Sequence, residues 1–143
     1  MFKIRQEQFD VFKPVAEEAF TRRLASFVRE RHPRAVVRLP DKTTTVRHLD
    51  DETLNGLVRV GIARARSYGL VLESSLAAFV VTMFLMAPNF DTHPLVRRVL
   101  KDEKVKEDAK FNRLLQGISD GNLRVVKNAY DPRAWLAEAE GGR

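Results

Sequence analysis

The feature that most constrains this chain is an apolar stretch from Leu76 to Ala87, which only Thr82 interrupts. A helix that spans a membrane needs about 20 apolar residues, and an extension toward the N-terminus would include Glu73. The stretch is therefore too short for a membrane span. A helix that is apolar on nearly every side is buried in a protein core. The sequence predicts a central buried helix over residues 73–87.

A second helix is predicted from the spacing of apolar residues after Asp50 and Asp51, either of which can serve as its N-cap. Gly69 supplies a natural stop. Gly56 and Gly61 lie inside this helix, where we expect them to permit close helix packing. The apolar positions that define it are Leu54, Leu57, Val58, Gly61, Ile62 and Ala65.

The N-terminal part of the chain, residues 4–31, also has apolar residues at steps of three or four, namely Phe9, Phe12, Ala16, Phe20, Leu24 and Phe27. Pro14 either kinks this helix or lies in the first turn of a new one. Residues 32–49 contain Pro33, Pro40 and a run of threonines, which is typical of a connecting loop with room for a short extended segment.

Shorter helical patterns follow the central helix. Asp91 or Thr92 can cap a helix that has Pro94 in its first turn. Amphipathic spacing predicts further helices over 111–118 and 123–130, a last stretch around Trp135, and a frayed tail over 137–143. We expect a single all-α domain over 1–143, an irregular bundle of five or six helices around the central apolar helix.

Composition narrows the possible functions. The chain has no cysteine, which excludes disulfides, thiolate metal sites and cysteine nucleophiles. Residues 1–10 mix apolar and charged side chains, unlike a signal peptide, so we expect a cytoplasmic protein. Hydrophobic residues make up 44% and charged residues 31% of the chain, a balance typical of a folded globular protein.

No catalytic or cofactor motif is recognisable. His32, His48 and His93 are not at metal-ligand spacing, and the sequence has no glycine-rich phosphate loop or nucleophile elbow. Asp91 and His93 are the nearest approach to an acid–base pair, with a helix cap beside a turn histidine as the alternative. We expect no enzyme activity, no metal site and no cofactor.

Charge is concentrated in one segment. Residues 22–47 hold eight arginines and lysines against Glu30 and Asp41, an excess of six that equals the formal net charge of the whole chain, +6. Such a segment can contact phosphates, an anionic membrane surface or an acidic protein, or can be a solvated face. It lacks interleaved aromatics, a zinc knuckle and a helix-turn-helix pattern, so a protein partner is favoured over nucleic acid.

Several pieces of the sequence occur in a characteristic order. They are Met1-Phe2-Lys3-Ile4-Arg5-Gln6-Glu7-Gln8-Phe9, then residues 57–69, then Met83-Phe84 and Phe90-Asp91-Thr92-His93-Pro94. In this order the chain resembles small bacterial accessory proteins encoded beside type VI secretion spike, PAAR-tip and toxin genes. The resemblance implies a cytoplasmic protein that binds a secreted effector or spike component as adaptor, chaperone or immunity factor.

The hypothesis from the sequence is a non-enzymatic protein-binding module, with an electrostatic binder of nucleic acid or anionic surfaces through residues 22–47 as the alternative. The helix over residues 54–65 adds positions beside its apolar stripe that are available for contact. The oligomeric state is left open. The predicted partner-binding residues are Arg22, Arg23, Arg29, Arg31, Arg34, Arg38, Arg59, Arg64, Arg66 and Tyr68.

Overall fold

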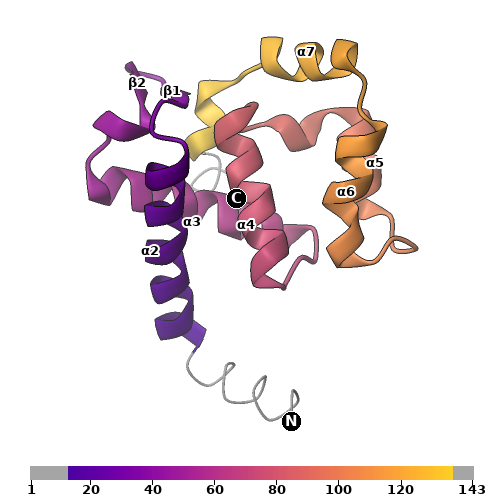
Figure 1. The fold of residues 1–143 in the computed structure, drawn as a ribbon, viewed down its shortest axis with the longest axis horizontal. Helices are drawn as coiled ribbons and strands as arrows, with labels where there is room; N and C mark the ends of the chain where they lie inside the picture. The colour runs from indigo at the N-terminus through magenta and orange to yellow at the C-terminus, as the bar shows by residue number, and fades with distance from the viewer. Residues whose placement is uncertain (1–12, 137–143) are drawn as a thin grey trace.

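The computed structural model describes residues 13–136, and it confirms an all-α bundle with one small sheet (Figure 1). The predicted apolar positions Phe9 and Phe12 and the predicted frayed tail 137–143 lie outside the described residues. The α-helices are α2 Lys13–Arg31, α3 Asp51–Ser67, α4 Glu73–Leu85, α5 Pro94–Lys101, α6 Lys110–Gly117 and α7 Asp120–Asn128. The strands and 3₁₀ turns are β1 Val36–Arg38, β2 Thr43–Thr45, η1 Val46–His48, η2 Phe90–Thr92, η3 Glu107–Ala109 and η4 Pro132–Leu136.

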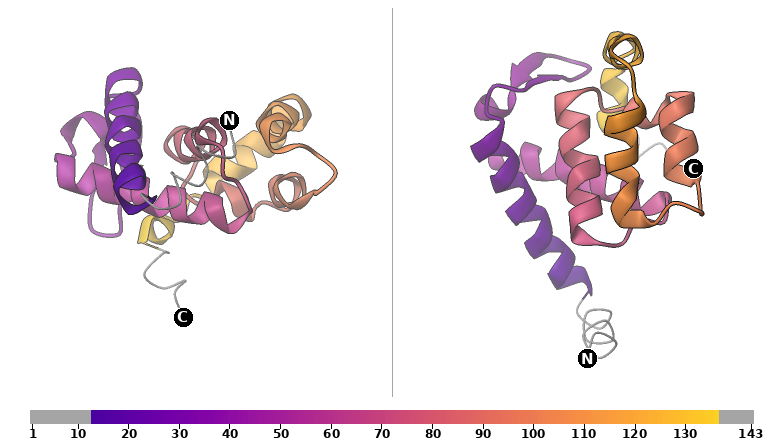
Figure 2. Two further views of the ribbon diagram at one scale, coloured as in Figure 1. Left: turned by 90° about the horizontal axis from the view of Figure 1, so that it is seen from below. Right: turned by 45° about the vertical axis from the view of Figure 1, so that its right-hand side comes forward.

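Helix α4 is the central element that the apolar stretch predicts. Its side chains Leu76, Phe79, Val80 and Met83 are buried. Helix α3 crosses behind α2 and α4 and packs against both (Figures 1 and 2). Helices α5, α6 and α7 lie on the other side of α4 from α2 (Figure 1). The bundle therefore has α4 between two groups of elements.

Aromatic side chains close the core at the C-terminal end of the described chain. The Trp135 ring is fully buried and its centroid lies 4.8 Å from that of Phe84 on α4. The ring of Phe79 lies 4.9 Å from that of Phe90, which belongs to η2. Contacts of this kind contribute roughly 0.5–1.5 kcal/mol beyond the burial of apolar area. They hold η2 and η4 against the central helix.

The contact between α3 and α4 depends on Gly61. A Cβ atom at this position would lie 2.8 Å from both Met83 Sδ and Val80 Cγ2, so the helices approach more closely than a side chain would allow. The expectation of close packing is confirmed for Gly61 and wrong for Gly56, where an added Cβ would meet nothing within 4 Å. Gly69 ends the helical region with φ of +86°, as the sequence predicts.

Helix boundaries follow local rules, with one tertiary contribution at the start of α4. Pro14 lies in the first turn of α2, which is one of the two positions the sequence allows. Helix α4 begins after Leu72, and its first amides are not capped by a neighbouring residue. Glu107 Oε2 accepts hydrogen bonds of 2.7 Å from the N–H groups of Val71 and Leu72 instead. A carboxylate from η3 therefore caps the central helix.

The segment expected to be a loop, 32–49, holds a two-stranded antiparallel sheet. Val36 pairs with Thr45, Val37 with Thr44 and Arg38 with Thr43. β-branched valine and threonine favour extended backbone, and Val37 is fully buried against the core. The short extended segment that the sequence allowed is thus one strand of a hairpin, and the threonine run is the other.

Candidate protein-binding site

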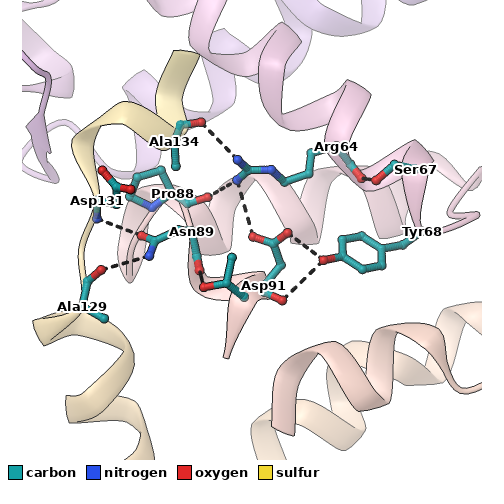
Figure 3. A network of polar contacts seen from close by, with 10 residues as sticks. Arg64, Ser67, Tyr68, Pro88, Asn89, Asp91, Ala129, Asp131 and Ala134 are labelled. Carbon is teal, nitrogen blue, oxygen red and sulfur yellow. Dashed lines mark hydrogen bonds and ion pairs between the residues drawn. The ribbon is translucent and has the colours of Figure 1, made fainter. Parts of the chain in front are cut away.

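A largely buried polar cluster joins α3, η2 and η4 (Figure 3). Arg64 donates to the carbonyl of Pro88, to Asp91 Oδ1 at 3.4 Å and to the carbonyl of Ala134 at 3.2 Å. The Tyr68 hydroxyl donates to Asp91 Oδ2 at 2.8 Å. The Asp91 side chain is only 4% exposed, so its charge is balanced by Arg64 inside the protein. This cluster connects segments far apart in the sequence.

Tyr68 is protonated throughout the neutral range. Burial raises the pKa of its phenol to about 12, and the hydrogen bond to Asp91 and the charge of that carboxylate act in the same direction. The phenol therefore serves as a stable donor to Asp91. Arg64 and Tyr68 are predicted partner-binding residues, and in the structure their polar atoms are occupied by contacts within the chain.

Asp91 and His93, the acid–base candidate, have separate partners. The oxygens of Asp91 accept from Arg64 and Tyr68. Nδ1 of His93 accepts from the Leu95 N–H at 3.2 Å and caps α5. The predicted cap at Asp91 or Thr92 is therefore wrong, and His93 is the capping residue. This capping histidine supports the structural alternative over an acid–base pair.

Arg29, from the basic segment, is a structural residue. Its guanidinium donates to the carbonyls of Val46, Arg47 and Leu49 at 3.3, 3.2 and 2.9 Å, and to Asp51 Oδ1 at 3.0 Å. These contacts join α2 to η1 and to the first turn of α3. The carbonyl partners satisfy the donors of Arg29, so it is not free for a ligand.

Four other predicted arginines form ion pairs with acidic residues outside segment 22–47. The N–O distances are 3.6 Å for Arg22–Glu18, 3.3 Å for Arg23–Glu73, 3.2 Å for Arg59–Glu18 and 3.1 Å for Arg66–Glu17. Surface pairs contribute only about 0–1 kcal/mol each to stability. They nevertheless reduce the charge that these arginines present to a partner.

Arg38 packs against the C-terminal region. Its guanidinium lies 4.2 Å from the centroid of the Tyr130 ring. The Tyr130 hydroxyl accepts from the Arg38 N–H at 3.0 Å and from Trp135 Nε1 at 2.8 Å. Arg38 thus holds the hairpin against the segment that follows α7.

Arg31 and Arg34 line an open hollow that is larger than the hollow of about 200 Å³ beside Arg22 and Arg29. Together with Glu30, His32, Pro33, Ala35 and Leu85 they line a cleft of about 480 Å³, here called the basic cleft. It lies where the end of α2 meets the end of α4. Arg34 is exposed and has no hydrogen bond or ion pair with another residue between 13 and 136.

Apolar side chains lie beside these cations. Leu85, at the end of α4, is 48% exposed, and Phe27 on α2 is 40% exposed. The Arg31 guanidinium lies 5.3 Å from the centroid of the Phe27 ring, and the His32 ring contacts the same ring edge-on at 6.4 Å. Arginines and aromatics around an exposed apolar surface are enriched in protein interfaces. The basic cleft has this composition.

Sequence reasoning missed both apolar residues of this site. Phe27 continues the apolar spacing of α2, which predicts burial, yet the helix turns Val28 into the core instead. Leu85 is the last helical residue of the apolar stretch. Its position at the end of the helix could have indicated exposure, because side chains at helix ends often lie outside the core.

Comparisons of the chain with protein-family models, with curated proteins and with solved structures found no match in any of the three. Within residues 13–136, no three histidine, cysteine, aspartate or glutamate side chains are grouped as metal ligands would be. No helix in the same range is long and apolar enough to cross a membrane.

Proposed function

We propose that this chain is a non-enzymatic protein-binding module that docks an acidic surface of a partner protein on the basic cleft. The observation that carries the proposal is the exposed Arg34, which has no ion pair or hydrogen bond with another residue in the described range, beside Arg31, with exposed Leu85 and Phe27 next to them. Two cations recognise carboxylates, and the apolar side chains contribute buried area. Such a combination gives both specificity and affinity.

The resemblance to accessories of type VI secretion extends the proposal. The partner is then a secreted effector or a spike component, and the chain acts in the cytoplasm as its adaptor, chaperone or immunity factor. An immunity factor must bind its toxin stably, whereas an adaptor must release its cargo. The rate at which the partner dissociates from the basic cleft distinguishes these roles.

The test is affinity purification of the tagged chain from its native cells after nuclease treatment, with mass spectrometry of the retained proteins. The variant Arg31→Glu/Arg34→Glu reverses the two cations of the cleft. Its matched control is Arg124→Glu/Lys127→Glu on α7, which changes two exposed cations and therefore alters the net charge equally. Circular dichroism establishes that both variants fold.

We expect one stoichiometric protein with the wild type and the α7 control, and its loss with the cleft variant. Retention of the same protein by the cleft variant contradicts the proposal. Equal loss from both variants also contradicts it, because binding would then follow overall charge.

A second candidate is an electrostatic binder of nucleic acid or anionic surfaces. It is favoured by further exposed cations of segment 22–47, Lys42 and Arg47, which lie on or beside the hairpin. Binding of this kind weakens steeply as salt increases. Recovery of nucleic acid without nuclease, and of no protein with nuclease, would favour this candidate.

A further inference from the structure

A second hollow is lined by residues of α5 and α6. These two helices lie on the opposite side of α4 from α2 (Figure 1). The hollow has a volume of about 220 Å³. Its lining is mostly apolar and comes from both helices: Leu95, Val96, Arg98 and Val99 from α5, and Arg113, Leu114, Gly117 and the following Ile118 from α6. We call it the α5–α6 groove.

The walls of this groove are held in place by a buried contact. Lys110 Nζ, at the start of α6, donates to the carbonyl of Leu100 at 2.6 Å, in the last turn of α5. A lysine at this position stabilises the carbonyl end of α5. Because the two helices are joined in this way, the groove is formed before any ligand arrives.

Apolar surface continues beyond the groove. Leu115 on α6 is 64% exposed, and Leu95 on α5 is also exposed. Leu115 lines a small adjoining hollow of about 20 Å³ that reaches Met86 and Phe90 in the core. Exposed leucines around a hollow with an apolar floor are typical of a surface that another protein covers.

The charges at the groove specify what can cover it. Arg98 lies on one wall and Arg113 on the other, and both are exposed. Neither has an ion pair or side-chain hydrogen bond to another residue in the described range. A ligand that fills the apolar floor therefore meets one cation on each side.

We propose that the α5–α6 groove binds a short amphipathic helix of a partner protein, whose apolar stripe is bordered on both sides by aspartate or glutamate. The volume lies below the roughly 300–1,000 Å³ of small-molecule sites, which suits one or two inserted side chains. Each wall is a helix of eight residues, about 12 Å long, so the docked helix has two to three turns in contact. This is helix-in-groove recognition.

The inference is independent of the basic cleft. The two sites lie on opposite sides of α4, and they share no lining residue. A partner bound at the cleft leaves the groove open to a second segment. Binding to the groove can therefore be tested in a variant in which the cleft is already disabled.

The probe is a stapled helical peptide of about 12 residues, with leucines along one stripe and glutamates on both borders, because unstapled peptides of this length are marginal helices in water. A second peptide has lysine at each glutamate position. Each is titrated into isotopically labelled full-length Arg31→Glu/Arg34→Glu protein, and amide shifts are followed by NMR. We expect the acidic peptide to shift signals of residues 95–99 and 113–118.

Two variants decide which features matter. Arg98→Glu/Arg113→Glu should weaken binding of the acidic peptide by about tenfold or more. Leu115→Ser, at an exposed position that should not disturb folding, should weaken it as well, and Arg124→Glu/Lys127→Glu should leave it unchanged. Equal binding of the basic peptide, shifts outside the groove, or no shifts at millimolar peptide would overturn the inference. Failure here leaves the result of the pull-down on the basic cleft unaffected.

Discussion

Replacing Gly61 with alanine tests how closely α3 and α4 approach. The new Cβ would lie 2.8 Å from Met83 Sδ and Val80 Cγ2. Met83 can move its sulfur, because its side chain is flexible, whereas valine has one strongly preferred rotamer in a helix. The helices must therefore separate slightly near Val80.

The magnitude follows from two opposing terms. Alanine stabilises an isolated helix relative to glycine by about 1 kcal/mol. Overpacking a core position costs about 1–3 kcal/mol. Gly56→Ala, in the same helix and with nothing within 4 Å of its Cβ, has only the first term. The free energy of unfolding of Gly61→Ala should therefore be about 1–3 kcal/mol below that of Gly56→Ala.

The assay is urea unfolding followed by circular dichroism at 222 nm, with the wild type and both variants measured at one pH and salt concentration. The slopes should agree, so that the midpoints report stability alone. Adding Val80→Ala to Gly61→Ala should recover part of the overpacking cost, although it also removes apolar contacts. The reasoning is refuted if Gly61→Ala is as stable as Gly56→Ala.

Three further predictions concern polar contacts. Asp91→Ala should lower the free energy of unfolding by about 3 kcal/mol, because it leaves Arg64 without its buried partner; a double-mutant cycle with Arg64→Met that gives no coupling would contradict this. The pKa of Tyr68 is raised from its ordinary value of 10.0 to about 12, so the stability that this phenol contributes is complete below pH 10 and is lost as the pH rises to 12. The free energy of unfolding of Tyr68→Phe should therefore fall less steeply than that of the wild type between these pH values. An equally steep fall in both proteins would argue against the raised pKa. Glu107→Ala should lower stability by about 1 kcal/mol through loss of the α4 cap, with faster amide exchange at Val71 and Leu72 as the diagnostic; unchanged exchange there would count against the cap.

Helices α3 and α4 could be predicted from the sequence because their information is local. Apolar residues at helical spacing, a cap at Asp50 and a stop at Gly69 all lie within one segment. The hairpin was harder to predict. Its two strands have only three residues each, too few for an alternating pattern to identify them.

Contacts between distant segments could not be predicted. Arg64 and Asp91 are 27 residues apart in the sequence. Glu107 accepts hydrogen bonds from Val71 and Leu72, which precede it by 36 and 35 residues. Nothing in the spacing of either pair indicates that they meet. The charge count left out Glu17, Glu18 and Glu73, which lie outside the basic segment. Glu18 pairs with Arg22 one turn further along α2, which is a local contact. The pairs of Glu73 with Arg23, of Glu18 with Arg59 and of Glu17 with Arg66 form only in the folded chain.

The candidate site was therefore only partly predictable. The basic segment contained Arg31 and Arg34, but the sequence could not separate them from Arg29 and Arg38, whose side chains hold the fold together. Which cations are free is decided by the contacts of the folded chain. The neighbouring Leu85 is brought to the cleft from a different helix.

The central claim, that a protein docks on the basic cleft, is tested most directly by photo-crosslinking in native cells. A benzophenone amino acid replaces Leu85, which lines the cleft, and in a control chain it replaces Val125, which is exposed on α7. The account predicts one protein adduct at position 85 that is absent at position 125 and is lost when Arg31 and Arg34 are changed to glutamate. No protein adduct at position 85, or the same adducts at both positions, would contradict it.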